Sequence, residues 1–288
     1  MYKPFYLFVL RLYRLKIGNV YIFKPIFNIA KKILKKKSII VNGNIMFLDS
    51  KDSLGLSFGV FEPFETEVIK KHVKKGDTVV DIGANIGYYT LILSKLVGDS
   101  GKVFAFEPDP ENFSLLEKNV KANNLKNAIL INKAVSDKTG KTSLFLSENN
   151  NADHRIYKSH DSNYKKKRKS IVVDVVKFDD YFKNKPKISF VKIDVEGAEG
   201  AVIGGMGSTI KNNLSLKILL ELFPIANVNF GITPEIYLNC LTKHGFDIYS
   251  LNEEKNRVEI VNEIDKLLLE YTVKKENFTN LLCIKNKK

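Results

Sequence analysis

The chain has 288 residues, is 44% hydrophobic and has a mean hydropathy of -0.14, which predicts a soluble globular protein with one α/β domain and an N-terminal extension. Two cysteines and four scattered histidines give no disulfide framework and no metal-ligand spacing, so we expect a cytoplasmic protein without a metal site. The net charge of +14 is uneven: residues 1–37 hold ten basic residues and no acidic one, whereas the rest has 36 basic and 32 acidic residues. This balance makes nucleic acid an unlikely partner of the main domain.

The basic N-terminal segment mixes aromatic residues with single positive charges. Its longest apolar stretch, Phe5 to Leu10, is far shorter than the roughly 20 residues of a membrane-spanning helix. Arg11 and Arg14 interrupt the apolar region, which argues against a secretory signal. Two alternatives remain for residues 1–37: peripheral contact with anionic lipid at the inner face of the membrane, or a helical cap packed on the domain. Residues 39–48 then predict a hairpin, so we assign residues 1–60 to an extension and 61–288 to the main domain.

A glycine-containing turn is the first chemical motif. A predicted helix over residues 62–73 precedes the run VVDIGANIG at 79–87, and a second helix is predicted over 86–97. The next apolar run ends at Glu107, which lies 20 residues after Gly87. A carboxylate at this spacing can accept both hydrogen bonds of a ribose diol, so the pattern is typical of a site for a nucleotide-like cofactor.

This turn departs from the dinucleotide fingerprint GxGxxG. Asn85 stands where that fingerprint has the glycine that lets the backbone touch a pyrophosphate. Asp81, two residues before Gly83, would repel phosphate and attract an ammonium group. The pattern therefore favours S-adenosylmethionine, which has an adenosine, an amino acid head and a sulfonium. The alternative is that Asp81 only ends a strand and Glu107 only opens a turn.

A polar inserted loop over residues 148–170 follows a predicted helix at 110–123, capped by Asp109, and strands at 128–135 and 142–147. The loop contains His154 next to an acid, a cation and a tyrosine, and ends in a basic run at 165–169. Loops at the carboxyl edge of a parallel sheet often carry substrate contacts. The alternative is a solvated surface excursion.

A second acidic centre follows the predicted strand at 188–194. Its end brings Asp194 and Glu196 to the same sheet edge as Glu107, because parallel strands present their carboxyl ends to one crevice. Helix capping is the alternative role for Asp194, Glu196 and Glu199. Further strands are predicted over 172–176, 216–222, 246–251 and 281–284, with helices over 178–183 and 234–243.

The sequence resembles the FkbM-type family of class I S-adenosylmethionine-dependent methyltransferases over about residues 61–224. The motifs that carry the resemblance are DIGANIGYYT, FAFEPDP and FVKIDVEGAEG. The resemblance implies an α/β, Rossmann-like fold with a seven-stranded, mostly parallel sheet, an antiparallel last strand and helices on both faces. It also implies contacts to the methionine moiety from Gly83, Asn85 and Gly87, to the ribose from Glu107, and to the adenine from Ala134, Val135 and Ser136.

Methyl transfer to a hydroxyl needs an acceptor atom held in line with the methyl carbon and a base for the hydroxyl proton. Asp194 is the first candidate for that base, with Glu196 and His154 behind it. The chain has no NPPY or DPPY tetrapeptide of the kind that resembles amino-directed methyltransferases. We therefore expect O-methylation of a glycan or related metabolite. The alternatives are an RNA methyltransferase that uses the basic N-terminal arm, and a membrane-associated binding protein without chemistry.

Overall fold

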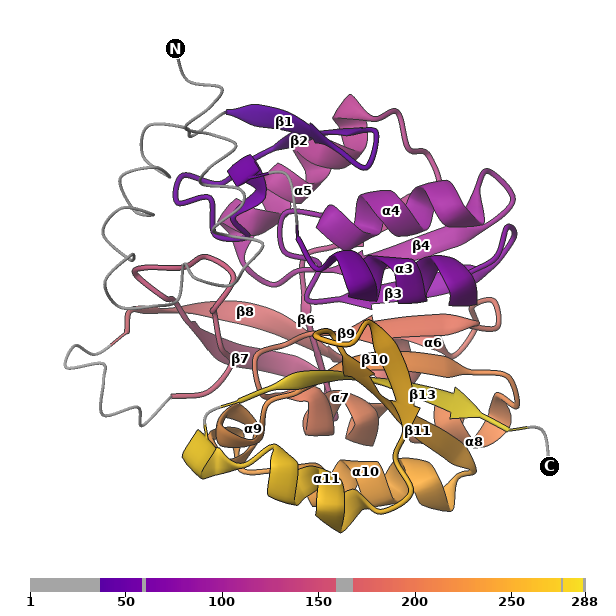
Figure 1. Ribbon diagram of the computed structural model, residues 1–288. Helices are drawn as coiled ribbons and strands as arrows, with labels where there is room; N and C mark the ends of the chain where they lie inside the picture. Colours follow the sequence, from indigo (N-terminus) through magenta and orange to yellow (C-terminus); the bar gives the residue numbers. More distant parts are fainter. Residues whose placement is uncertain (1–36, 59–60, 159–167, 276, 287–288) are drawn as a thin grey trace.

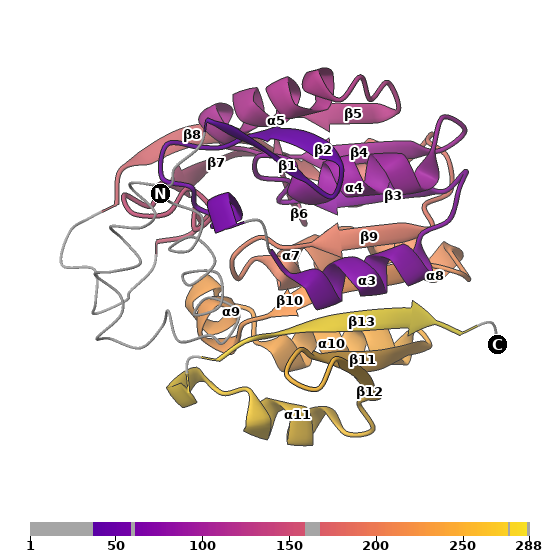
Figure 2. The ribbon, with the colours of Figure 1, turned by 45° about the horizontal axis from the view of Figure 1, so that its top comes forward.

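A large mixed sheet runs through the molecule, and Figure 2 shows its strands stacked from β5 at the top to β12 at the bottom. The computed structural model describes residues 37–58, 61–158, 168–275 and 277–286. In spatial order the strands are β12 (Arg257–Ile260), β11 (Phe246–Asn252), β13 (Thr279–Lys285), β10 (Lys217–Leu222), β9 (Phe190–Ile193), β3 (Thr78–Ile82), β4 (Lys102–Phe106) and β5 (Ala128–Ile131). The five strands from β10 to β5 are parallel, and β13 lies antiparallel between β10 and β11.

The predicted α/β fold is confirmed, including the antiparallel last strand. The sheet has one strand more than the seven expected, because β12 turns back antiparallel beside β11 at the edge. The apolar side chains of β12, Val258 and Ile260, are 41% and 49% exposed. A strand that buries neither of its apolar residues gives no strong periodic signal in the sequence.

The predicted strand over residues 128–135 is wrong, because the chain leaves the main sheet within it. β5 ends at Ile131, and β6 (Ala134–Ser136) joins β8 (Ser170–Lys177) and β7 (Gly140–Phe145) in a separate three-stranded sheet, ordered β6-β8-β7. Asn132 holds the turn between the two sheets, since its amide donates to the carbonyl oxygens of Glu107 and Pro108 at 2.8 and 3.1 Å.

Helices cover both faces of the main sheet (Figure 1). One face packs against α3 (Pro63–His72), α4 (Tyr88–Val97) and α5 (Pro110–Ala122); the other packs against α6 (Phe178–Phe182), α7 (Glu199–Gly205), α8 (Gly207–Asn212), α10 (Pro234–Lys243) and α11 (Ile264–Glu270). The remaining helical segments are α9 (Pro224–Phe230) and two short 3-10 turns, η2 (Leu56–Phe58) and η3 (Val273–Lys275). Along each strand alternate side chains enter the two cores: Val79 and Phe190 face α4, whereas Val80 and Val191 face α7.

The predicted hairpin precedes this domain as β1 (Ser38–Val41) and β2 (Asn44–Phe47). Its turn residues Asn42 and Gly43 have φ of 49° and 69°, which is the left-handed conformation that a two-residue hairpin turn requires. Within the described ranges, no helix is long and apolar enough to cross a membrane. The predictions for residues 1–36 and for 159–167 lie outside the described residues.

Candidate active site

A cavity opens at the carboxyl ends of β3, β4 and β9. Its lining combines apolar side chains with a few polar groups, as is usual for small-molecule and cofactor sites. Most of the predicted site residues line it, namely Gly83, Asn85, Glu107, Ala134, Val135, His154, Asp194 and Glu196. Asp81, Gly87 and Ser136 are not part of its lining. Eight of the eleven residues predicted for the site therefore line one cavity and three do not, and the role of each stays a prediction.

The glycine turn after β3 forms the floor of the cavity. Gly83 has φ of +81°, and a Cβ atom there would lie 1.8 Å from the carbonyl oxygen of Asp194. Glycine is required because the ends of β3 and β9 touch at this point. Gly87 has φ of +96° and packs against Leu116 of α5, where a Cβ would lie 2.7 Å from Cδ1. Its predicted contact with the cofactor stays a prediction.

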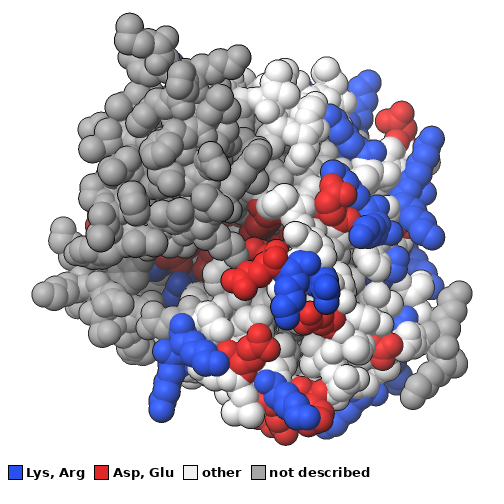
Figure 3. Space-filling model, viewed as in Figure 1, with Lys and Arg blue, Asp and Glu red and all other residues white. Residues whose placement is uncertain are grey.

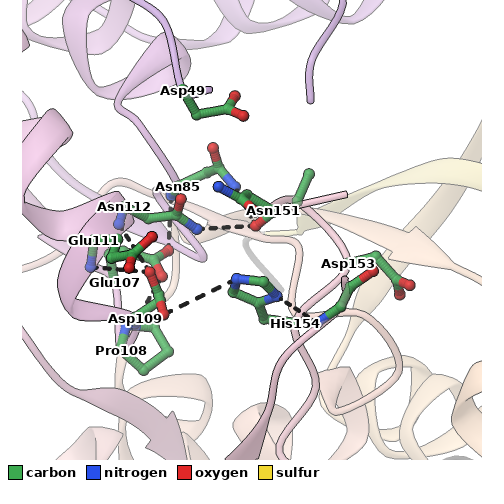
Figure 4. Close-up of polar contacts among 12 residues, drawn as sticks. Asp49, Asn85, Glu107, Pro108, Asp109, Glu111, Asn112, Asn151, Asp153 and His154 are labelled. Atoms are coloured by element: carbon green, nitrogen blue, oxygen red, sulfur yellow. Dashed lines mark hydrogen bonds and ion pairs between the residues drawn. The ribbon is translucent and has the colours of Figure 1, made fainter. Parts of the chain in front are cut away.

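Glu107 lies at the end of β4 and joins two loops of the cavity (Figure 4). Its Oε2 accepts the backbone N–H of Asn85 at 2.8 Å, and its Oε1 accepts that of Asp109 at 2.9 Å. Burial raises the pKa of this carboxyl from 4.5 to about 8. A carboxylate has about four lone-pair sites, so two remain for a ligand with paired hydroxyl groups.

Residues 147–158, which we call the strap, cover the cavity. The carbonyl oxygen of Asn151 accepts the side-chain amides of Asn112 at 2.9 Å and Asn85 at 3.3 Å (Figure 4). On its other side Asn151 accepts from Lys51 Nζ at 2.7 Å and donates its backbone N–H to Ser53 at 2.8 Å. The strap is thus fixed to the site from both sides. The sequence offered no signal that singled out Asn112 or Asn151.

His154 of the strap is held as a neutral ring. Its Nδ1 accepts the backbone N–H of Ser147 at 3.0 Å, which assigns the ring proton to Nε2. Nε2 lies 4.0 Å from Oδ2 of Asp109. Burial lowers the pKa of this histidine, which keeps it neutral. Because its free lone pair is already used by Ser147, the geometry favours a hydrogen-bond donor over the predicted base.

A buried ion network fixes the far end of the strap. Asp153 accepts from Arg155 Nε at 2.7 Å and from Arg168 Nη2 at 2.6 Å. Arg155 Nη2 lies 3.9 Å from Oε2 of Glu196, and the hydroxyl of Tyr157 donates to the Glu196 carbonyl at 3.0 Å. These contacts hold residues 153–157 in place, and the predicted alternative that this loop contacts substrate stays a prediction. Arg168, which belongs to the predicted basic run at 165–169, contributes to this network through its ion pair with Asp153.

The acidic groups at the sheet edge have different surroundings. Asp194 is 38% exposed, lines the cavity and pairs through Oδ2 with Lys192 at 2.9 Å. Asp81 is 1% exposed and accepts from the Thr90 hydroxyl at 2.6 Å, so its predicted contact with a cofactor ammonium stays a prediction. Glu199, the first residue of α7, accepts the backbone N–H groups of Val195 and Gly197 at 3.1 and 3.2 Å, so it holds the turn before α7 and does not cap the helix.

Ser136 lies beyond the cavity, where its hydroxyl donates to Asp137 at 3.0 Å. Its predicted place beside the adenine stays a prediction. Over the described stretches, no group of three or more His, Cys, Asp and Glu side chains could hold a metal ion.

Five parallel strands, an antiparallel strand inserted beside them and a buried glutamate directly after β4 are the arrangement of a class I S-adenosylmethionine-dependent methyltransferase. The model of the Methyltransferase FkbM domain matches residues 81–271. The chain belongs to this family, and its cofactor is S-adenosylmethionine.

Two curated relatives are similar to parts of the chain. Methyltransferase 1 of Beauveria bassiana is 26% identical over 144 residues, which is 44% of this chain and 57% of the relative. Hexuronic acid methyltransferase AglP of Haloferax volcanii is 25% identical over 203 residues, which is 67% of this chain and 75% of the relative. The chain thus spans little more than half of the fungal relative.

Among solved structures, an S-adenosylmethionine-dependent O-methyltransferase from Thermotoga maritima is 14% identical, with a TM-score of 0.45 over 87% of this chain and 78% of that one. An rRNA methylase from Streptococcus thermophilus is 11% identical, with the same TM-score over 77% of this chain and 95% of that one.

The side chains of the cavity fit this cofactor. Oδ1 of Asn112 is buried and has no hydrogen-bond partner among the described residues, so it is available to a donor group of the adenosine. The remaining lone pairs of Glu107 suit the paired hydroxyl groups of a ribose, and this contact stays a prediction. The apolar side chains of the wall, Ala134, Val135, Leu144 and Ile156, suit the faces of an adenine ring.

Proposed function

We propose that this protein methylates a hydroxyl oxygen of a glycan or related metabolite. The observation that carries the proposal is that Asp194, a partly exposed carboxylate, lines the same cavity as Glu107. A ribose acid and a second, accessible carboxylate in one cavity suit a cofactor and an acceptor held side by side. The similarity to the Haloferax relative, which is named a hexuronic acid methyltransferase, supports a sugar-type acceptor.

When bound, S-adenosylmethionine supplies an electrophilic methyl group on a sulfonium. Glu107 and Asn112 hold the adenosine end, and the strap excludes water from it. Asp194 would accept a hydrogen bond from the acceptor hydroxyl and take its proton as that oxygen bonds to the methyl carbon and the carbon–sulfur bond breaks, which leaves the sulfur as a neutral thioether. Glu196, held by Arg155, forms the wall on the acceptor side of Asp194, and His154 donates from Nε2.

The test compares the wild type with Asp194→Asn, and with Asp99→Asn as an exposed control carboxylate. Methyl transfer from labelled cofactor is measured over a panel of uronic acids, neutral sugars and glycosides. We expect Asp194→Asn to bind S-adenosylmethionine within about threefold of the wild type and to lose about 100-fold or more in kcat, since general-base catalysis contributes roughly 100- to 10,000-fold. Normal turnover by Asp194→Asn would remove Asp194 from the mechanism.

RNA is the competing acceptor class. On the face seen in Figure 3, acidic and basic side chains of the described residues are interspersed, which does not favour a nucleic-acid surface. RNA affinity would fall steeply with salt as counterions are released. Salt-sensitive RNA retention together with methyl transfer to RNA would overturn the glycan proposal. A cytoplasmic location and lipid contact through residues 1–37 are separate expectations, and cosedimentation of the full chain with phosphatidylserine vesicles tests the second.

A further inference from the structure

A positively charged side chain is buried at the centre of the parallel sheet. Lys192 of β9 is 3% exposed and lies in register with Asp81 on β3 and Leu219 on β10. It therefore shares the face of the sheet covered by α3 and α4. Removing an ammonium group from water is costly, and an aliphatic residue would suit this position better for stability alone. A buried ammonium group at this position therefore indicates an anionic partner.

Lys192 is surrounded by carboxylates and one aromatic ring. Its Nζ lies 2.9 Å from Oδ2 of Asp194 and 4.6 Å from the ring centroid of Tyr89. Burial alone would lower the pKa of Lys192, but the carboxylates of Asp194, Glu65, Asp81 and Glu62 outweigh it and raise the pKa above its ordinary value. The side chain is thus a permanent cation.

The carboxylates around Lys192 are not equivalent. Asp81 and Glu65 are 1% and 3% exposed, and each has another donor: Asp81 accepts from Thr90 at 2.6 Å and Glu65 from Asn280 at 2.5 Å. Glu62 accepts the Tyr89 hydroxyl at 2.7 Å. Only Asp194 of the four lines the cavity, and Lys192 makes its short contact with this carboxylate.

We propose that Lys192 is a positioning residue for the transfer reaction. Its ammonium group holds Oδ2 of Asp194 from beneath and leaves Oδ1 to accept the hydrogen bond of the acceptor hydroxyl. Within the described part of the chain Oδ1 has no hydrogen-bond partner, so one carboxylate oxygen is anchored and the other is available. This role rests on the proposed function. The competing role is purely structural, as a counter-ion that keeps Asp81 and Glu65 within the fold.

The first test uses two variants. Lys192→Met keeps a long, unbranched side chain and removes the charge, whereas Lys192→Arg keeps the charge. Lys285→Met is the matched control, because Lys285 is also buried in the sheet, at 8% exposure, but donates to the carbonyl oxygen of Ile210 away from the cavity. We expect Lys192→Met to bind S-adenosylmethionine within about threefold and to lose about 30-fold or more in kcat. Lys192→Arg should recover about tenfold of that loss, and Lys285→Met should keep the wild-type kcat.

A double-mutant cycle then separates positioning from folding. If Lys192 acts through Asp194, adding Lys192→Met to Asp194→Asn reduces kcat by less than about twofold further. The inference would be overturned if the kcat losses of the two single variants multiply in the double variant, or if Lys192→Met keeps the wild-type kcat. Should Lys192→Met fail to fold, the ¹⁵N-lysine spectrum of Asp194→Asn decides: the signal of a buried ammonium should shift in that variant, and an unmoved signal counts against the contact.

These outcomes are distinct from a failure of the proposed function. If the wild type binds the cofactor but methylates no hydroxyl acceptor, the proposed function falls, and the positioning role with it. If the wild type is active and the kcat losses of the two single variants multiply in the double variant, the proposed function stands and only the role of Lys192 is lost.

Discussion

Glu107 combines two tasks in one side chain, since it joins the loops at Asn85 and Asp109 and faces the cavity. Burial raises the pKa of Glu107 to about 8, which favours the protonated form at neutral pH in the cofactor-free protein. Two ribose hydroxyl groups would donate best to the ionised form, so with the proposed ribose contact, cofactor binding releases a proton below about pH 8.

We therefore expect S-adenosylmethionine affinity in the wild type to rise with pH between 6 and 8, by at most about tenfold per pH unit. Calorimetry in two buffers of different ionisation enthalpy measures the released proton. Glu107→Gln should bind about 1 to 3 kcal/mol more weakly, because it loses an accepted hydrogen bond, and should show no such pH dependence. A pH-independent dissociation constant in the wild type would contradict this protonation state.

His154 gives a second prediction at the level of single residues. Since Ser147 occupies Nδ1, the ring acts as a donor, and a glutamine amide can replace that function. We expect His154→Gln to lower kcat by less than about tenfold, well below the loss in Asp194→Asn. The comparison is a kcat measurement on both variants with the same acceptor. A loss in His154→Gln as large as that in Asp194→Asn would restore histidine as the base.

The residues around the site were predictable to different degrees. Glu107 and Asp194 end apolar strands, and a strand end is visible in a sequence. Asp81 also lies on a strand, yet its side chain turns to the α4 face, and strand alternation does not reveal which face carries the ligand. Lys192 is a lone charge inside the apolar run FVKI, and a charge at such a position indicates a buried ion pair.

At the level of elements, the contact between β3 and β9 depends on one missing side chain. A Cβ at Gly83 would overlap the backbone of Asp194, whereas a Cβ at Gly207, the first residue of α8, would meet nothing within 4 Å. The variants Gly83→Ala and Gly207→Ala therefore form a matched pair for testing this contact.

We expect Gly83→Ala to lower the free energy of unfolding by at least about 2 kcal/mol and to abolish cofactor binding, because the two strand ends must separate. Gly207→Ala should leave stability unchanged or raise it by about 0.4 to 1 kcal/mol. Urea denaturation and cofactor titration of both variants provide the measurement. Equal stability of the two variants would show that the strand ends can move apart without cost.

Long, regular elements were predicted closely, whereas short ones depended on tertiary context. The helix α10 agrees with its predicted range, and Asp109 caps α5 through the backbone N–H groups of Glu111 and Asn112 as expected. The missed helix α9 has only seven residues, and its apolar positions give too few repeats for a helical period. The division between β5 and β6 depends on which sheet each strand joins, which local sequence does not encode.

For the whole molecule, burial of acids sets the dependence of stability on pH. Burial raises the pKa of Glu62 and Glu199 to about 7 and that of Glu107 to about 8, from an ordinary value of 4.5. Below pH 4.5 these groups are protonated in both states. Above it they ionise first in the unfolded chain, so the native state binds more protons and stability falls as pH rises through 7 to 8.

We expect the denaturation midpoint of the cofactor-free protein to be lower at pH 8.5 than at pH 6.5. The lowered pKa values of His72 and His154 act in the opposite sense, but mainly below their ordinary value of 6.5. The double variant Glu62→Gln, Glu107→Gln should flatten the profile between these pH values. A midpoint that rises towards pH 8.5 would contradict the raised carboxyl pKa values.

The position of β13 has a consequence for how the chain can be assembled during translation. Residues 279–285 form a strand that lies between β10 and β11. These two strands do not pair with each other and are joined only through β13. A nascent chain that has reached residue 260 can pair β3, β4, β5, β9 and β10, and separately β11 with β12, but cannot join the two parts. Until β13 is synthesised, the inner edges of β10 and β11 remain open to pairing with other chains. Arrested nascent chains that end before and after residue 285 should therefore differ sharply in protease resistance and in binding to chaperones.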